Sequence, residues 1–407
     1  MAPVTRLPET EWRRAQGLRR IVAALSAGGG AVKIVGGAVR DTLLGLAVAD
    51  IDLATPLLPD EVIRRLEAND IKVVPTGIAH GTVTAIASGE RHEVTTLRRD
   101  VETDGRRATV AFADDWREDA ARRDFTINAL YADPDSGAID DYFGGLADLE
   151  AGCVRFIGDA ATRIAEDHLR ILRFYRFAAR FGRGELEYPS HAAVIAARQS
   201  LKSLSRERIA DELLKILSLP DPRAIVAQMT ADGIFEVILP ELADDFAVTL
   251  DRLIANEDAA AVEPAPLRRL AALLPPAGPT AEQVASRLRL STRQRKHLGA
   301  VAARRGDLRP ARQLAHAIGL DGARDAWLLA GDTAAARAAA EALHDWEVPV
   351  LPIKGGDIVA RGVAAGPDVA SILRAVEAAW VAEDYPDVAR VAALVDQMIG
   401  RVRDSRQ

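Results

Sequence analysis

The spacing of apolar residues divides the chain into two parts with different periodicities. From residue 32 to about residue 140, short apolar runs alternate with segments of helical spacing, which predicts strands at residues 49–54, 71–74, 82–87 and 92–97. Residues 109–112 and 126–132 complete a small mixed sheet in this prediction. After about residue 155 strand patterns nearly vanish, and helical spacing recurs at residues 166–181, 206–217, 223–233, 266–274, 281–290 and 371–380. The expected fold class is α+β, a mixed sheet with helices followed by an all-helical remainder.

One stretch of the first part carries candidate chemistry. An apolar run ends at Gly36-Gly37 and helical spacing follows at once, an arrangement whose free backbone N–H groups suit an anion. Asp50 and Asp52 come next, and on a strand at residues 49–54 both carboxylates would point to the same face. Paired carboxylates attract a cation, and oxygen ligands suit Mg²⁺. Either motif alone is commonly a loop or a polar strand face, but together they are typical of phosphoryl or nucleotidyl transfer.

A second constellation runs from Arg122 to Leu130. Arg123 is suited to bidentate contact with a triphosphate, and Asp124 could accept a hydrogen bond from a ribose hydroxyl. The alternative interpretation is a charged helix end that leads into a strand.

A third constellation lies in the helical run at residues 166–177. Asp167, Arg170, Arg173 and Arg176 recur every three residues and would form a slanted band on one helix. Three unneutralised arginines could hold a nucleotide, while a carboxylate and a guanidinium could pair with a base edge. Such a stripe can also be a solvated face with an i,i+3 ion pair.

Composition limits the class of protein. The 407 residues carry a formal net charge of -7, which argues against indiscriminate binding of polyanions but leaves room for local basic clusters. Cys153 is the single cysteine, so no internal disulfide is expected. The N-terminal segment has the pattern of an amphipathic helix rather than a secretory signal, and no apolar stretch is long enough to span a membrane. A cytoplasmic protein is expected.

Four motifs in order carry a family resemblance. They are Gly36–Asp41 with Asp50-Ile51-Asp52, Arg122–Asn128, Asp141–Leu149, and Glu166–Arg170. The first resembles the head signature of the DNA polymerase β-like nucleotidyltransferases. Together the four resemble the bacterial class II tRNA nucleotidyltransferase and poly(A) polymerase family, and within it the CCA-adding enzymes.

The resemblance implies a polymerase β-like head followed by a helical neck, body and tail. Its domains would be an N-terminal helix at 1–30, the nucleotidyltransferase head at 31–150, a neck with the base-reading helix at 151–220, a body at 221–345, and a tail that binds tRNA at 346–407.

The resemblance also implies residue roles. Asp50 and Asp52 would be the catalytic residues that ligate two Mg²⁺ ions, with Glu93 a plausible third carboxylate. The other implied roles concern the nucleotide: Gly37, Arg40 and Arg123 at the triphosphate, Asp167 and Arg170 at the base of CTP or ATP, Arg173 and Arg176 at the phosphates, and Asp141–Leu149 as the element that lets the pocket change from C to A.

The implied function is template-independent addition of CCA to the 3′ end of tRNA from CTP and ATP. The segment Thr76–Thr82 resembles the CCA-adding form rather than the arginine-rich poly(A) form. Three alternatives stay open: a poly(A) polymerase, an enzyme that adds only CC or only A, and a catalytically silent RNA-binding protein.

Overall fold

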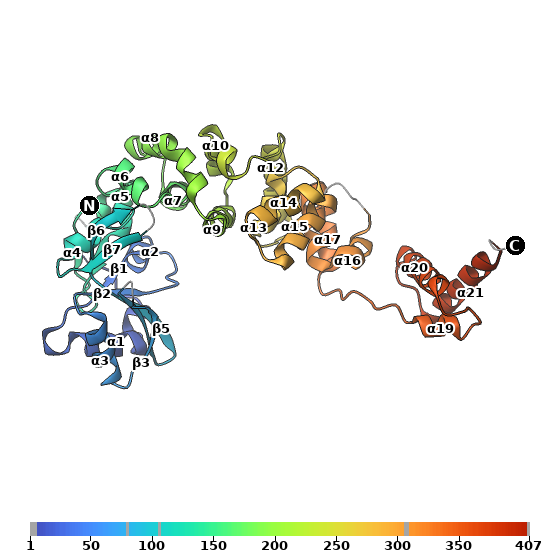
Figure 1. The fold of residues 1–407 in the computed structure, drawn as a ribbon, viewed down its shortest axis with the longest axis horizontal. Helices are drawn as coiled ribbons and strands as arrows, with labels where there is room; N and C mark the ends of the chain where they lie inside the picture. Colours follow the sequence, from blue (N-terminus) through green and yellow to red (C-terminus); the bar gives the residue numbers. More distant parts are fainter. Residues whose placement is uncertain (1–5, 79–80, 105–106, 305–308, 405–407) are drawn as a thin grey trace. The chain divides into compact units, whose positions relative to one another are not determined.

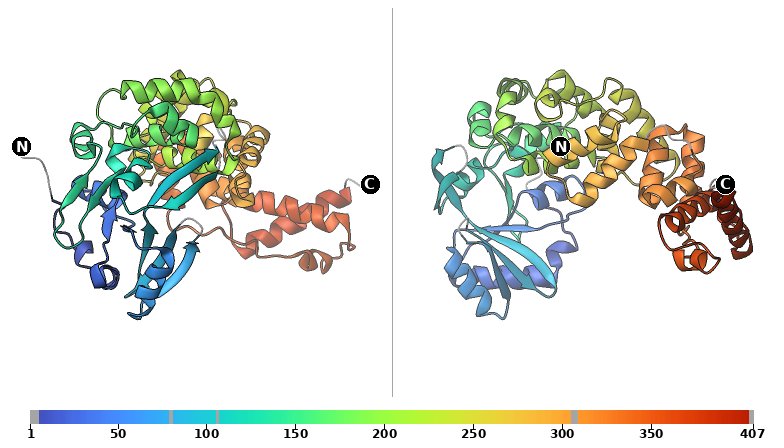
Figure 2. Two further views of the ribbon diagram at one scale, coloured as in Figure 1. Left: turned by 60° about the vertical axis from the view of Figure 1, so that its left-hand side comes forward. Right: turned by 45° about the vertical axis from the view of Figure 1, so that its right-hand side comes forward.

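A computed structural model describes residues 6–78, 81–104, 107–304 and 309–404 (Figures 1 and 2). Ala79 and His80 of the Thr76–Thr82 segment lie outside the described residues. The chain divides into two compact units. One comprises residues 1–212 and 228–238, and the other comprises residues 213–227 and 239–407.

A seven-stranded mixed sheet organises the first unit. Its order is β3-β4-β5-β2-β1-β8-β9; β2 and β5 are parallel, and the other neighbours are antiparallel. The strands are β1 Lys33–Val35, β2 Asp52–Thr55, β3 Lys72–Gly77, β4 Thr82–Ala87, β5 Glu90–Thr96, β8 Leu130–Ala132 and β9 Ile139–Asp141. Alternation is clearest in β4, where Val83, Ala85 and Ala87 are buried and the intervening residues are not. The predicted mixed sheet is confirmed.

Three strand predictions need correction. The strand predicted at 126–132 begins at Leu130, because residues 126–128 form a 3-10 helix. Residues 109–112 belong to a separate hairpin, β6 Arg98–Asp104 with β7 Arg107–Phe112, and do not join the main sheet. The strand predicted at 49–54 begins only at Asp52, because Val35 opposite it is the last residue of β1 and the chain turns away at Gly36. Asp50 therefore precedes the strand, so alternation along β2 does not fix its direction.

Helices cover the sheet and continue beyond it. The helices α1 Gln16–Ser26 and α3 Pro59–Glu67 pack side by side against β3, β4 and β5 (Figures 1 and 2). Leu18, Ile21 and Leu25 of α1 are buried there. The other helices of this part of the chain are α2 Gly37–Leu43, α4 Trp116–Ala121, α5 Gly145–Ala151, α6 Ala160–Glu166, α7 Arg170–Phe181, α8 Tyr188–Ala197, α9 Arg206–Leu217, α10 Arg223–Ala231 and α11 Ile234–Ile238.

The helix predicted at 166–181 is wrong in one respect, because it is interrupted at Asp167. This residue has extended backbone angles, φ -151° and ψ 104°, between α6 and α7. Its Oδ1 accepts a hydrogen bond from the Leu169 N–H at 3.1 Å, and its carbonyl accepts one from the Arg170 N–H at 3.0 Å. Aspartate can replace helical hydrogen bonds in this way, so Asp167 lies between two helices rather than in a band on one.

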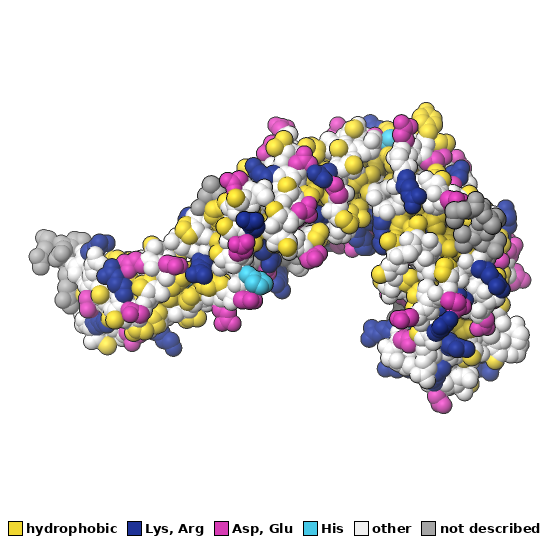
Figure 3. Space-filling model, turned by 180° about the vertical axis from the view of Figure 1, so that it is seen from behind, with side chains coloured by type: hydrophobic (Ala, Val, Ile, Leu, Met, Phe, Trp, Pro, Cys, Tyr) yellow, Lys and Arg dark blue, Asp and Glu magenta, His cyan; other side chains and the backbone are white. Residues whose placement is uncertain are grey.

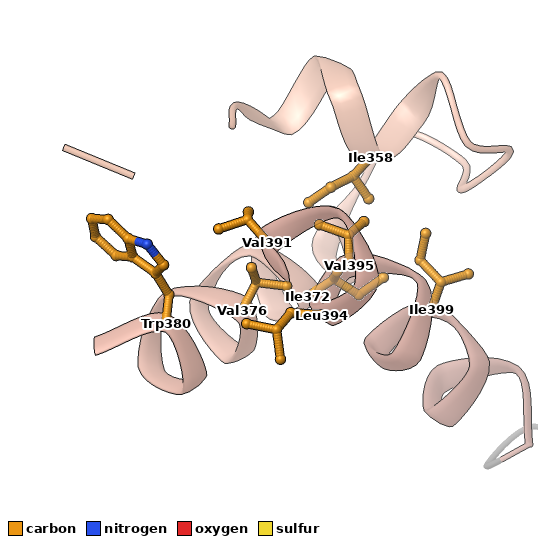
Figure 4. Close-up of a cluster of buried hydrophobic side chains, with 8 residues drawn as sticks. All are labelled: Ile358, Ile372, Val376, Trp380, Val391, Leu394, Val395 and Ile399. Atoms are coloured by element: carbon orange, nitrogen blue, oxygen red, sulfur yellow. The ribbon is translucent and has the colours of Figure 1, made fainter. Parts of the chain in front are cut away.

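The second unit is all helical in its described residues. Its helices are α12 Phe246–Ala259, α13 Pro266–Leu273, α14 Gly278–Arg287, α15 Thr292–Arg304, α16 Ala311–Ile318, α17 Leu320–Ala330, α18 Thr333–Leu343, α19 Gly355–Val359, α20 Pro367–Ala382 and α21 Val388–Asp404. Near the C-terminus, α19, α20 and α21 share an apolar core (Figure 4). Its buried members are Ile358, Ile372, Val376, Trp380, Val391, Leu394, Val395 and Ile399.

Charged side chains of both signs are interspersed on one face of the molecule. On the face drawn in Figure 3, Lys and Arg side chains lie among Asp and Glu side chains.

Among the described residues, no helix combines the length and apolarity needed to cross a membrane.

The interior of the second unit contains a buried ionic network. Arg268 and Arg269 of α13 are both fully buried, and each donates to one oxygen of buried Glu257. Arg268 also donates to Asp325 at 2.8 Å, and Arg269 donates to the Leu217 carbonyl at 2.9 Å. Because a buried charge without its partner is costly, Glu257 is required to hold the two guanidinium groups in place.

We expect Glu257→Gln to lower the free energy of unfolding by about 3 kcal/mol, because it leaves two buried guanidinium groups with one charged partner fewer. Urea unfolding followed by circular dichroism measures this. Glu341→Gln is the matched control, since Glu341 forms an exposed pair with Arg337 at 3.6 Å and should cost less than about 1 kcal/mol. Equal losses for the two variants would contradict the prediction.

Candidate active site

A pocket of about 400 Å³ in the first unit brings most of the predicted site residues together. It is lined by Gly36, Gly37, Arg40, Asp52, Arg123, Asp124, Asn128, Asp167, Arg170, Arg173 and Phe177. These residues come from the turn before α2, from α2 itself, from the start of β2, from the segment after α4, and from α7 and the break before it. Seven of the nine residues predicted from the sequence line it; the other two, Asp50 and Arg176, do not.

The glycine turn forms one wall. Gly36 has φ +69° and precedes the first residue of α2, a conformation that side-chain-bearing residues rarely adopt. A Cβ atom at Gly36 would lie 3.1 Å from Nη1 of Arg123. The missing side chain therefore allows this arginine to lie directly against the turn.

The carboxylates lie beside that turn. Asp52 pairs with Val35 in β1 and with Glu93 in the parallel strand β5. Burial raises the pKa of Asp52, and the charges of Glu93 and Asp50 raise it further, whereas Arg123 lowers it. Asp50 and Glu93 are thus both close enough to repel the charge of Asp52, an arrangement that favours a bound cation.

The donor set determines what kind of cation site is possible. Among the described residues, no group of three or more His, Cys, Asp and Glu side chains could hold a metal ion by itself. Mg²⁺ is commonly bound through one or two carboxylates together with phosphate oxygens of the substrate. The donor set around Asp52 would fit a magnesium site of that kind, in which a phosphate-bearing substrate supplies further oxygen ligands.

A chain of hydrogen bonds runs along the base of the pocket. Buried Arg40 donates to Asp41 at 2.8 Å and to the side-chain oxygen of Asn128. Asn128 donates to Asp124 at 2.9 Å, and Asp124 accepts from Nε of Arg173 at 2.7 Å. Burial alone would raise the pKa of Asp124, but Arg173, Asn128 and a backbone N–H together hold it below the usual value.

Aromatic rings complete this wall of the pocket. The guanidinium groups of Arg40, Arg173 and Arg176 lie 5.4, 5.2 and 4.7 Å from the centre of the Phe177 ring. Arg40 also lies 4.2 Å from the centre of Phe181. These distances allow cation–π attraction, so Phe177 helps to hold Arg40 and Arg173 at one edge of the pocket and Arg176 beside it.

The residues expected to read a base each have another partner in this structure. Asp167 accepts from Arg208 of α9 at 2.7 Å, and Arg170 donates to Glu166 at 2.6 Å. Arg170 also donates to the Arg122 carbonyl at 3.2 Å.

Arg176 donates to buried Glu212 and is not a lining residue, so its contact with phosphates remains a prediction. The description of Arg170, Arg173 and Arg176 as unneutralised is wrong, since each is bonded to a carboxylate.

Sequence reasoning missed Asn128 and Phe177 as pocket residues. Asn128 is the last residue of the motif Arg122–Asn128. Phe177 follows Arg173 at i+4, a spacing that places both side chains on the same face of the helix. The partners Arg208 and Glu212 lie in α9, two helices after α7.

Comparisons with known proteins identify the family of this chain. The sequence matches the family described as "Poly A polymerase head domain" at residues 32–155, and "Probable RNA and SrmB- binding site of polymerase A" at residues 185–246. The chain is 31% identical over 395 residues to the mitochondrial CCA tRNA nucleotidyltransferase 1 of Mus musculus, with 93% of this chain and 89% of the relative covered. The Homo sapiens enzyme is 32% identical with the same coverage.

Solved structures agree as well. The CCA-adding enzyme of Bacillus stearothermophilus in complex with CTP has a TM-score of 0.78 and 27% identity, over 96% of this chain and 99% of that one. The Thermotoga maritima enzyme complexed with tRNA shares the fold, with a TM-score of 0.69, 20% identity and 95% coverage of both chains. Because two of the relatives are mitochondrial, a cytoplasmic location stays a prediction. The similarity in sequence extends over nearly the whole chain, which therefore belongs to the CCA tRNA nucleotidyltransferase family and is a nucleotidyltransferase.

Proposed function

We propose that this enzyme adds C, C and A to the 3′ end of tRNA from CTP and ATP without a nucleic-acid template. The observation that carries the proposal is the single pocket that joins the glycine turn, Asp52, a set of arginines and Asp167. Relatives solved with CTP, with ATP and with tRNA support the choice of substrates.

The proposed reaction is an in-line displacement. The 3′ hydroxyl oxygen of the RNA bonds to the α-phosphorus, the bond to the bridging oxygen of the β-phosphate breaks, and pyrophosphate leaves with its electron pair. Asp50 and Asp52 would hold Mg²⁺, which when bound lowers the pKa of the attacking hydroxyl and neutralises phosphate charge. Arg123 and the backbone at Gly37 would bind the triphosphate, while Arg40 and Arg173 supply positive charge from the wall of the pocket.

Base choice follows from hydrogen-bond polarity. Cytosine and adenine each present an amino donor beside a ring-nitrogen acceptor, whereas uracil and guanine present a carbonyl oxygen in the position of the amino group. A carboxylate that accepts and a guanidinium that donates suit the first pair. We propose that Asp167 and Arg170 play these parts, with the base replacing their present partners Arg208 and Glu166.

An incorporation assay tests the function. Purified protein is incubated with tRNA ending before the tail, after C, or after CC, and with labelled CTP or ATP separately. We expect CTP incorporation on the first two ends and ATP incorporation on the third, stopping after one A. Long ATP tails on any RNA would indicate a poly(A) polymerase, and incorporation of only one nucleotide would indicate a CC-only or A-only enzyme.

We expect Asp52→Asn to lower kcat by more than about 100-fold, because even groups that only support a metal ligand are worth about 10- to 100-fold. The neighbouring charges of Asp50 and Glu93 would then act on an amide, so the fold should be retained. Asp60→Asn, at an exposed position in the first turn of α3, is the control for the same chemical change. A kcat of Asp52→Asn within about 3-fold of the wild-type value would refute the assignment, because a tenfold change already corresponds to about 1.4 kcal/mol in activation free energy.

Asp124→Asn tests how Arg173 is held. The pKa of Asp124 in the folded state lies below the ordinary aspartate value of 3.8. Its ion pair therefore stabilises the fold above pH 3.8 and loses this contribution as pH falls through the folded-state pKa. At pH 7 the variant should be less stable by about 3 kcal/mol. The gap to wild type should shrink below pH 3.8. Urea unfolding between pH 7 and pH 3 checks this, and a pH-independent gap would show that the charge of Asp124 contributes nothing.

A further inference from the structure

Arg123 is held from behind by a buried tyrosine. Its Nε lies 3.1 Å from the hydroxyl of Tyr131 in β8, and its Nη2 lies 3.5 Å from Oδ2 of Asp119 in α4. The Tyr131 hydroxyl lies 2.6 Å from that same Oδ2. Both Tyr131 and Asp119 are buried, so the three groups form a closed triangle inside the unit.

The direction of each hydrogen bond in this triangle is fixed by the chemistry of the groups. A carboxylate only accepts, so the single hydroxyl proton of Tyr131 is donated to Asp119. The hydroxyl oxygen must then accept the proton of Nε, because a guanidinium group only donates. Only this arrangement satisfies the hydrogen-bonding groups of all three residues. Rotation of the guanidinium group would break its contact with Tyr131 or its contact with Asp119.

The geometry leaves one nitrogen for the pocket. Nη1 of Arg123 has no hydrogen-bond partner among the described residues and lies against the turn at Gly36. The charge of Asp52 also acts on Arg123 from the pocket side, and so competes for the guanidinium group. A hydroxyl that holds Nε from behind would keep Nη1 directed at the turn rather than at Asp52.

We propose that Tyr131 is a positioning residue that directs Nη1 of Arg123 at the triphosphate through the contact of its hydroxyl with Nε. This inference rests on the proposed function, since it assumes a triphosphate beside Gly36 and Gly37. Asp119 secures the arrangement: its Oδ1 accepts from the Arg98 backbone N–H at 3.1 Å, so the carboxylate is itself fixed.

Replacing Tyr131 by phenylalanine isolates the hydroxyl. The ring packs edge-on against Trp116 and Tyr142, with centroids 5.6 and 5.9 Å away, and phenylalanine keeps both contacts. It also keeps the ring under the Arg123 guanidinium, 5.3 Å from its centroid. Only the hydroxyl is lost, and with it the acceptor for Nε and the hydrogen bond to Asp119.

We expect Tyr131→Phe to raise KM for CTP and for ATP by the same factor of about ten, with kcat changed less than about twofold, because a triphosphate contact is common to both nucleotides. Equilibrium dialysis with labelled CTP and no added metal should show the same factor in Kd. An unchanged KM and Kd, or an effect on one nucleotide only, would overturn the proposal.

Two tyrosines provide matched controls. Tyr188 is exposed on α8, so Tyr188→Phe should change neither stability nor KM. Buried Tyr175 donates its hydroxyl to Asp232 at 2.8 Å, so Tyr175→Phe should lower stability about as much as Tyr131→Phe while leaving KM unchanged. If Tyr175→Phe raised KM equally, the effect of Tyr131→Phe would be a general loss of stability and the proposal would fail.

A double-mutant cycle ties the effect to Arg123. In an Arg123→Lys background, the Nε contact no longer exists, so Tyr131→Phe should have less than about twofold further effect on KM. A full additive effect there would overturn the proposal, and this comparison remains decisive if the single variant is poorly stable. A wild-type protein that incorporates neither nucleotide would instead refute the proposed function, while the CTP binding measurement would still test Tyr131.

Discussion

Mutual repulsion among cationic groups is the constraint on which this pocket depends. A site for a triphosphate gathers arginines, and arginines packed together without acids between them would repel one another at short range. In this structure each pocket arginine has its own carboxylate: Arg40 has Asp41, Arg123 has Asp119, Arg170 has Glu166 and Arg173 has Asp124. The positive charge is therefore held in fixed positions, and the rings of Phe177 and Phe181 support it from the apolar side.

The same constraint explains how a chain of net charge -7 can offer a site for a polyanion. Binding of the ligand depends on which N–H donors still face the pocket after each arginine has formed its ion pair with a carboxylate. Arg123 illustrates this, since two of its nitrogens are used behind the pocket and the third lies at the glycine turn. The acids thus serve mainly to set direction, and the magnitude of the local charge is secondary.

Local sequence patterns predicted the parts of the site that are local in the chain. The glycine turn, the aspartates after it and the helix at 206–217 follow from apolar spacing and from residue types within one element. The break at Asp167 was missed because helical periodicity continues across it, although aspartate is a residue that competes for backbone hydrogen bonds. The partners Arg208 and Glu212 depend on how α9 packs against the region of α7, and no pattern within a single element contains that information.

The ion pairs of the pocket fall into two kinds, and the division matches the proposed chemistry. At the phosphate end the carboxylates are buried, with Asp124 at 10% side-chain exposure and Asp119 at 7%, so exchanging their partners would be costly. At the base end the two pairs differ: Arg170 and Glu166 are 15% and 14% exposed, whereas Asp167 and its partner Arg208 are 33% and 46% exposed. The open pair of Asp167 contributes little to stability and can be replaced. In the proposed reaction, every cycle presents the same triphosphate but not the same base. A pocket with permanent pairs at one end and an exchangeable acceptor at the other therefore keeps the reacting group fixed while the base is chosen anew.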